Sequence, residues 1–155
     1  MEDGGLQEQL LRAWIGVNGM LKNSQATREL TYNEAVVMKL VYDRYQADGV
    51  GRTAVGSIVL ETNMLKSLVT RTVGALCAKG YLIRERGGAD ARALFVRPSA
   101  SHLPDFLAVH RRSLALARQI IDVVGPEDAA AFVRMYEKLT AAGFRLRSED
   151  KKLNQ

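Results

Sequence analysis

Apolar residues recur at helical spacing along most of the chain. The first such run comprises Leu6, Leu10, Leu11, Trp14, Ile15, Val17 and Leu21. This spacing predicts a long amphipathic helix near the N-terminus. A polar break follows, and Thr31 and Glu34 then have the spacing of a capping box. We therefore expect a second helix to begin at Thr31.

The middle of the chain predicts two short helices followed by a hairpin. Thr53 is placed to cap a helix that continues to Leu60, and a turn at Thr62-Asn63 separates it from a helix over 65–79. Gly80 is a typical residue to end that helix. Two strand segments, 81–86 and 93–97, flank a glycine-rich turn, which predicts a β-hairpin.

The last third predicts two more helices. One extends over 101–124, and Gly125-Pro126 separates it from another that reaches Gly143. Four helices, a basic hairpin and two helices predict a mainly α fold with a small β-hairpin wing, a winged helix-turn-helix. The long outer helices carry more apolar surface than a thin central module can cover, so we expect a homodimer.

The predicted organisation is one compact domain overall, with four segments in chain order. They are an N-terminal dimerisation helix (1–29), a winged helix-turn-helix DNA-binding module (30–99), C-terminal dimerisation helices (100–147) and a polar tail (148–155). Composition agrees with a globular chain: 47% of the 155 residues are hydrophobic and 25% are charged. The chain contains no secretion signal and no run long enough to span a membrane, so we expect a cytoplasmic protein.

The positive charge is concentrated in the middle of the chain. Eight cations and three anions lie from Arg52 to Arg97, so this segment carries a net charge of +5, equal to that of the whole chain. The remainder is neutral. Such an asymmetry is typical of a phosphate-facing module within a neutral scaffold, although a solvated face with chance clustering would give the same count.

No set of residues indicates catalysis. The chain has no nucleophile–base set, phosphate loop or metal-binding cluster, so we expect neither an enzyme nor a required cofactor or metal. His102 and His110 are eight residues apart, too far for a helical metal pair. Cys77, the one cysteine, lies on the apolar stripe of its helix, which favours core packing over redox sensing.

Three motifs in fixed order resemble the MarR family of bacterial regulators. The first is Leu30-Thr31-x-x-Glu34-x-x-Val37, the second runs from Val69-Thr70-Arg71 to Lys79-Gly80-Tyr81-Leu82-Ile83-Arg84, and the third is Asp90-x-Arg92-Ala93 followed by Leu94 and Val96. The resemblance covers about Leu30 to Ser113. Three places depart from the pattern: Pro98-Ser99, His102 and Gly74. Gly74 costs about 1 kcal/mol relative to Ala within a helix, and it would permit close approach of DNA or of a neighbouring helix.

Candidate DNA-contacting side chains gather near the start of the 65–79 helix. They are Lys66, Ser67, Thr70 and Arg71. This end of a recognition helix enters the major groove, where an arginine such as Arg71 can donate two hydrogen bonds to a guanine edge. An ordinary solvated helix face is the alternative.

The hairpin supplies further candidates. Arg86 and Arg92 flank its tip, and a narrow minor groove attracts inserted arginine. The resemblance implies that Asp90 braces Arg92 rather than touching DNA; the alternative is a solvated turn. Arg52 and Arg84 could each reach a phosphate.

The resemblance also implies a crevice for a small aromatic or lipophilic effector. Candidate lining residues are Trp14, Tyr32, Met38, Tyr42, Phe106 and His110. Plain core packing explains each of them equally well. Together, these observations and the resemblance predict a transcriptional regulator that responds to a ligand and acts as a repressor. We expect it to bind a pseudo-palindromic operator of double-stranded DNA as a homodimer. The alternative is a winged-helix protein-interaction module without sequence-specific DNA binding.

Overall fold

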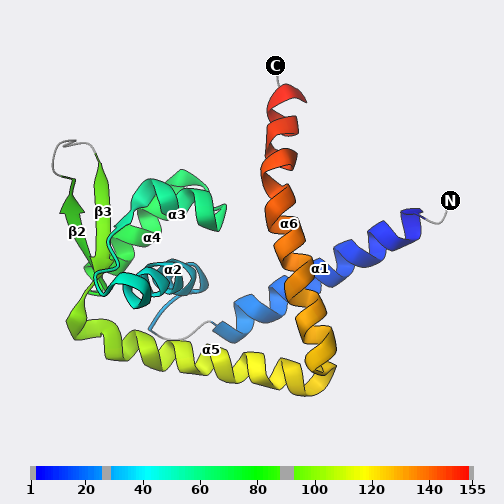
Figure 1. The fold of residues 1–155 in the computed structure, drawn as a ribbon, viewed down its shortest axis with the longest axis horizontal. Coiled ribbons are helices and arrows are strands. Elements are labelled where there is room, and N and C mark those ends of the chain that lie inside the picture. Colours follow the sequence, from blue (N-terminus) through cyan, green and yellow to red (C-terminus); the bar gives the residue numbers. More distant parts are fainter. Residues whose placement is uncertain (1–2, 26–28, 88–92, 154–155) are drawn as a thin grey trace. The chain divides into compact units, whose positions relative to one another are not determined.

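A computed structural model describes residues 3–25, 29–87 and 93–153, with only the backbone at 3–4, 24–25 and 144–153. The elements, drawn in Figure 1, are α1 (Asp3–Gln25), α2 (Tyr32–Asp48), β1 (Thr53–Ala54), α3 (Val55–Thr62), α4 (Lys66–Ala78), β2 (Leu82–Arg86), β3 (Leu94–Pro98), a 3-10 turn (Ala100–His102), α5 (Leu103–Val124) and α6 (Pro126–Leu153). The chain forms two compact units, Met1–Ser113 and Leu114–Gln155. The predicted fold class is confirmed.

The hairpin belongs to a three-stranded antiparallel sheet, because β1 pairs with the outer side of β3. The prediction that Thr53 caps α3 is therefore wrong. Thr53 lies in β1 opposite Val96, is fully buried, and donates its hydroxyl to the carbonyl of Gly51 at 3.0 Å. A β-branched residue suits a strand, and the partner strand that decides the matter is distant in sequence.

One apolar core fills the first unit. Its buried side chains come from α2, α3, α4, the sheet and the start of α5: Leu30, Val37, Met38, Val41, Ile58, Val69, Val73, Leu76, Tyr81, Leu82, Val96, Phe106 and Val109. These residues fix α4 against α2, α3 and β2. The core therefore determines which face of α4 remains at the surface.

The last helix is longer than its pattern predicts. We expected it to end at Gly143, with a polar tail from 148, whereas α6 continues to Leu153. The residues after Gly143 are largely good helix formers, and one internal glycine costs only about 1 kcal/mol. The helix therefore passes through Gly143.

Large apolar side chains remain exposed on the long helices of each unit. On α1 they are Leu6, Leu10, Leu11, Trp14, Ile15 and Met20, and in the second unit they include Leu114, Ile120, Ile121, Val123, Phe132, Val133, Tyr136 and Leu139. Among the described residues, no helix combines the length and the apolar character needed to cross a bilayer.

Candidate nucleic-acid interface

A short turn joins α3 to α4, as a helix-turn-helix requires. α3 ends at Thr62, and the next residue, Asn63, has a left-handed φ of 58°, a conformation that asparagine tolerates well. The hydroxyl of Thr62 donates to the carbonyl of Ile58 at 2.6 Å and accepts from the amide of Met64 at 3.3 Å. The predicted turn at Thr62-Asn63 is thus present, and it sets the start of α4 at Lys66.

α4 has one buried and one exposed face. Val69, Thr72, Val73 and Leu76 are buried, and Thr72 meets its own hydrogen-bonding need by donating to the carbonyl of Leu68 at 2.7 Å. The opposite face near the helix start carries all four predicted contact residues, Lys66, Ser67, Thr70 and Arg71, and all are exposed. We refer to this exposed face of α4 as the α4 stripe.

The α4 stripe is electropositive. No carboxylate pairs with Lys66 or Arg71 within the described part of the chain. The first turn of α4 contains no acidic residue, and Leu65 at its N-cap supplies no capping side chain. The amide groups of this turn and the helix dipole therefore add to the positive potential of the two side chains.

The far end of α4 is locked by a Schellman motif. Gly80 has a φ of 85°, and its amide donates to the carbonyl of Cys77 at 3.1 Å while that of Tyr81 donates to Leu76 at 2.9 Å. This confirms the predicted helix end at Gly80. The left-handed glycine reverses the chain so that β2 starts immediately beside α4.

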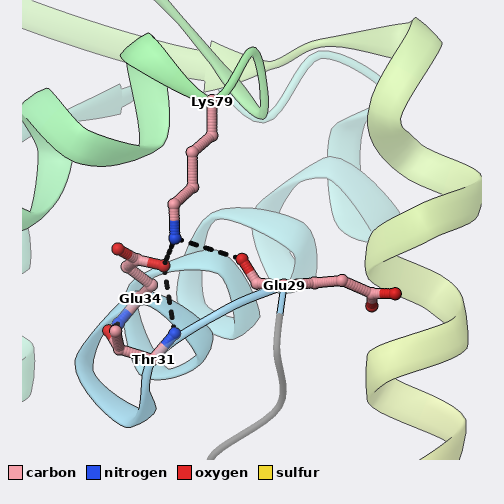
Figure 2. Close-up of polar contacts among 4 residues, drawn as sticks. All are labelled: Glu29, Thr31, Glu34 and Lys79. Carbon is pink, nitrogen blue, oxygen red and sulfur yellow. Dashed lines mark hydrogen bonds and ion pairs between the residues drawn. The ribbon is translucent and has the colours of Figure 1, made fainter.

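A polar cluster fastens this end of α4 to the start of α2 (Figure 2). The Nζ atom of Lys79 donates to Oε2 of Glu34 at 2.6 Å and to the carbonyl of Glu29 at 3.1 Å. The same Oε2 atom accepts from the amide of Thr31 at 3.0 Å, which confirms the predicted capping box. Arg112 of α5 pairs with the Glu29 carboxylate at 2.9 Å. Residues of α2, α4 and α5 thus meet around one linker.

The wing arginines fall into two groups. Nε of Arg52 lies 3.4 Å from Oε2 of Glu85, its guanidinium lies 3.7 Å above the Phe95 ring, and Arg97 pairs with the same carboxylate. The charge of Arg52 is thus shared with Glu85, a partner that the sequence alone did not identify. Its reach to a phosphate stays a prediction.

Arg84 and Arg86 form the second group of arginines. Both are exposed, and neither has a carboxylate partner among the described residues. The amide of Gly87 donates to the carbonyl of Ala93 at 2.9 Å and closes the described part of the hairpin. Arg92 and its expected support Asp90 lie outside the described residues.

The predicted crevice residues divide between an aromatic cluster and the core. The ring centroids of Tyr42 and Phe106 are 5.2 Å apart, and His110 lies 6.0 Å from each. Met38 is 1% exposed and Phe106 only 2%, so both are packed as core. Trp14 is exposed on α1, Tyr32 is half-buried, and neither joins this cluster. A ligand role for these residues stays a prediction.

Burial also changes the chemistry of His110. Desolvation, followed by the nearby positive charge of Lys39, lowers the pKa of His110 below its ordinary value, and Asp43 offsets this in part. His102 instead packs against Tyr81, at 5.3 Å between ring centroids. Cys77 is partly buried against the core, as its position on the stripe predicted.

Comparison with known proteins identifies the fold. No protein-family model and no curated sequence matches the chain. Among solved structures, BpsR of Bordetella bronchiseptica is similar with a TM-score of 0.72 and 17% identity, over 88% of this chain and 98% of that one. PcaV of Streptomyces coelicolor is similar with a TM-score of 0.69 and 16% identity, over 86% and 91%. A mutant of MarR from E. coli, solved with operator DNA, gives 0.70 and 13%, over 89% and 95%. The chain therefore has the fold of the MarR-like regulators.

Proposed function

We propose that the chain is a transcription regulator that binds double-stranded DNA through the α4 stripe and the hairpin. The observation that carries this proposal is the exposed, unpaired positive charge of Lys66 and Arg71 on a helix whose opposite face is fixed in the core. A recognition helix held in this way can enter the major groove with its N-terminal residues against base edges. Arg86, at the end of β2, is placed to contact the flanking backbone or minor groove.

The working unit is a homodimer. The exposed apolar side chains of α1, and those of the second half of α5 and α6, need a partner surface, because large apolar side chains exposed in such number along a helix are typical of protein–protein contacts. A second copy supplies that surface with two-fold symmetry. Two recognition helices then read half-sites roughly 10 bp apart, one turn of the duplex.

A small molecule regulates this binding. The structure of BpsR concerns regulation of its DNA binding by 6-hydroxynicotinic acid, and PcaV was solved with its natural ligand. In this chain, the ligand would contact the half-buried groups of the aromatic cluster, Tyr42 and His110. A ligand that fits only one spacing of the two DNA modules shifts the equilibrium between them by its differential affinity. Such a regulator works in the cytoplasm and has no catalytic activity.

The alternative is a winged-helix module that binds protein, and salt dependence separates the two. A labelled duplex of arbitrary sequence is titrated with the wild type and with the Lys66→Gln/Arg71→Gln variant, from roughly 50 to 200 mM salt. DNA binding predicts affinity that falls steeply with salt, and a shallower slope for the variant. Lys138→Gln on α6 is the matched control and leaves the slope unchanged. Wild type that binds no duplex at low salt contradicts the proposal.

A further inference from the structure

Gly74 lies at the edge of the α4 stripe, three residues beyond Arg71. Helical spacing puts it on the same face as Ser67 and Arg71 and opposite the buried Leu76. Its φ is not positive, so the backbone here does not require glycine. Gly74 is half-buried. A residue that weakens a helix on its polar side, without any turn to form, needs another explanation.

The side chain of Arg84 lies where a side chain at position 74 would project. A Cβ atom placed on Gly74 would come 3.3 Å from a terminal guanidinium nitrogen of Arg84. Apart from the local backbone, this is the one contact within 4 Å that such an atom would make to the described residues. Gly74 therefore leaves room for the guanidinium on the helix surface.

The turn at Gly80 explains why these two residues meet. Six helical residues from Gly74 to Gly80 rise about 9 Å, and three extended residues from Tyr81 to Arg84 return about 10 Å. Arg84 also alternates onto the same side of β2 as the buried Leu82. Its side chain is thus directed along α4, away from the Glu85 carboxylate that pairs with Arg52 and Arg97.

We propose that Gly74 and Arg84 form one composite position of the DNA-contacting surface, in which the strand supplies a guanidinium that the helix leaves room for. The inference rests on the proposed function. Gly74 lies about 10 Å further along the helix than Ser67, toward the end that leaves the groove floor. The ligand of Arg84 is therefore a backbone phosphate at the groove edge, which a guanidinium binds with two hydrogen bonds.

The test is a double-mutant cycle on a duplex of arbitrary sequence, since a phosphate contact does not depend on base sequence. Arg84→Ala weakens binding on the order of tenfold and lowers the salt slope by about 2 for a dimer, one phosphate per protomer. Gly74→Ala displaces the guanidinium and weakens binding roughly threefold in the wild type, but not in the Arg84→Ala background.

Stability provides the second readout. Gly74→Ala raises the melting temperature by about 2–4 °C, because alanine favours the helix and the flexible end of Arg84 can move aside. Weaker binding in a more stable protein excludes misfolding as the cause. Gly56→Ala, at an exposed position of α3 with nothing within 4 Å, is the matched control and changes binding by less than about twofold.

The inference is overturned by any of the following results. Equal weakening by Gly74→Ala in both backgrounds means that Gly74 acts without Arg84. Unchanged affinity of the Arg84→Ala variant contradicts the phosphate contact. When the cycle is repeated on a second duplex of different sequence, a loss of affinity seen with only one of the two indicates base recognition instead. If the wild type binds no duplex, the proposed function fails as well, whereas binding that ignores both substitutions refutes this inference alone.

Discussion

Replacing Lys79 by methionine removes one ammonium group from the cluster that holds α4 to α2. The Glu34 carboxylate would keep its bond from the Thr31 amide at 3.0 Å but lose the Lys79 donor at 2.6 Å. The Glu34 side chain is only 7% exposed, so little water can replace that donor. Methionine retains the length and the helix propensity of lysine, which restricts the change to the charge.

The expected loss follows from the burial of the two partners. A hydrogen bond to a charged group contributes about 1.5–3 kcal/mol, and a buried carboxylate left short of donors is at the upper end. The Lys79 side chain is 40% exposed, which weakens the pair by solvent screening. We therefore expect Lys79→Met to lower the free energy of unfolding by about 1.5–2 kcal/mol.

Urea unfolding measures this loss, and one fixed protein concentration is used for all variants because the stability of the proposed dimer would depend on concentration. Lys39→Met is the control, because Lys39 forms an exposed i,i+4 pair with Asp43 that contributes only about 0.3–0.5 kcal/mol. In a cycle with Glu34→Gln, the two substitutions should couple by at least about 1 kcal/mol. Equal losses for Lys79→Met and Lys39→Met, without coupling, would refute the reasoning.

Three further predictions concern the end of α4, His110 and the DNA surface. Gly80→Ala strains a left-handed residue and brings a Cβ to 2.8 Å from the His102 ring, so thermal unfolding should show a loss of at least about 1–2 kcal/mol. Burial lowers the pKa of His110, so the unfolded chain binds more protons just below about pH 6.5. The contribution of neutral His110 to the free energy of unfolding is thus fully present above that pH and declines as pH falls through the lowered pKa. In a pH series of urea melts, His110→Gln should flatten this dependence of the unfolding free energy on pH. An unchanged slope contradicts the prediction. Arg71→Ala should relax base preference in duplex selection, whereas Arg86→Ala should weaken binding evenly and reduce its salt dependence; unchanged binding by both removes these contacts.

Local signals account for the parts of the fold that the sequence predicted. The capping box at Thr31 and Glu34 spans three residues, and the helix end at Gly80 depends on one residue and its neighbours. The exposed face of α4 follows from helical periodicity, which places Val73 inside and Arg71 outside. Each of these features is determined within about two helical turns.

Contacts between distant residues were beyond the sequence pattern. Lys79 and Glu34 are 45 positions apart, and Thr53 meets Val96 only once the sheet has formed. The pairing of Glu85 with Arg97 is an exception, because strand alternation alone puts both residues on the same side of the hairpin. Gly74 departs from the family pattern in the sequence itself, but its contact with Arg84 depends on the chain reversal at Gly80.

Selection of bound duplexes from a random DNA pool at moderate salt tests the central claim most directly. A dimeric regulator with two recognition helices predicts a two-fold symmetric consensus with half-sites roughly 10 bp apart. An enriched pool without a consensus would contradict sequence reading by the α4 stripe and indicate binding to backbone or shape. No enrichment, from protein freed of any bound small molecule, would contradict DNA binding itself and favour the protein-interaction module.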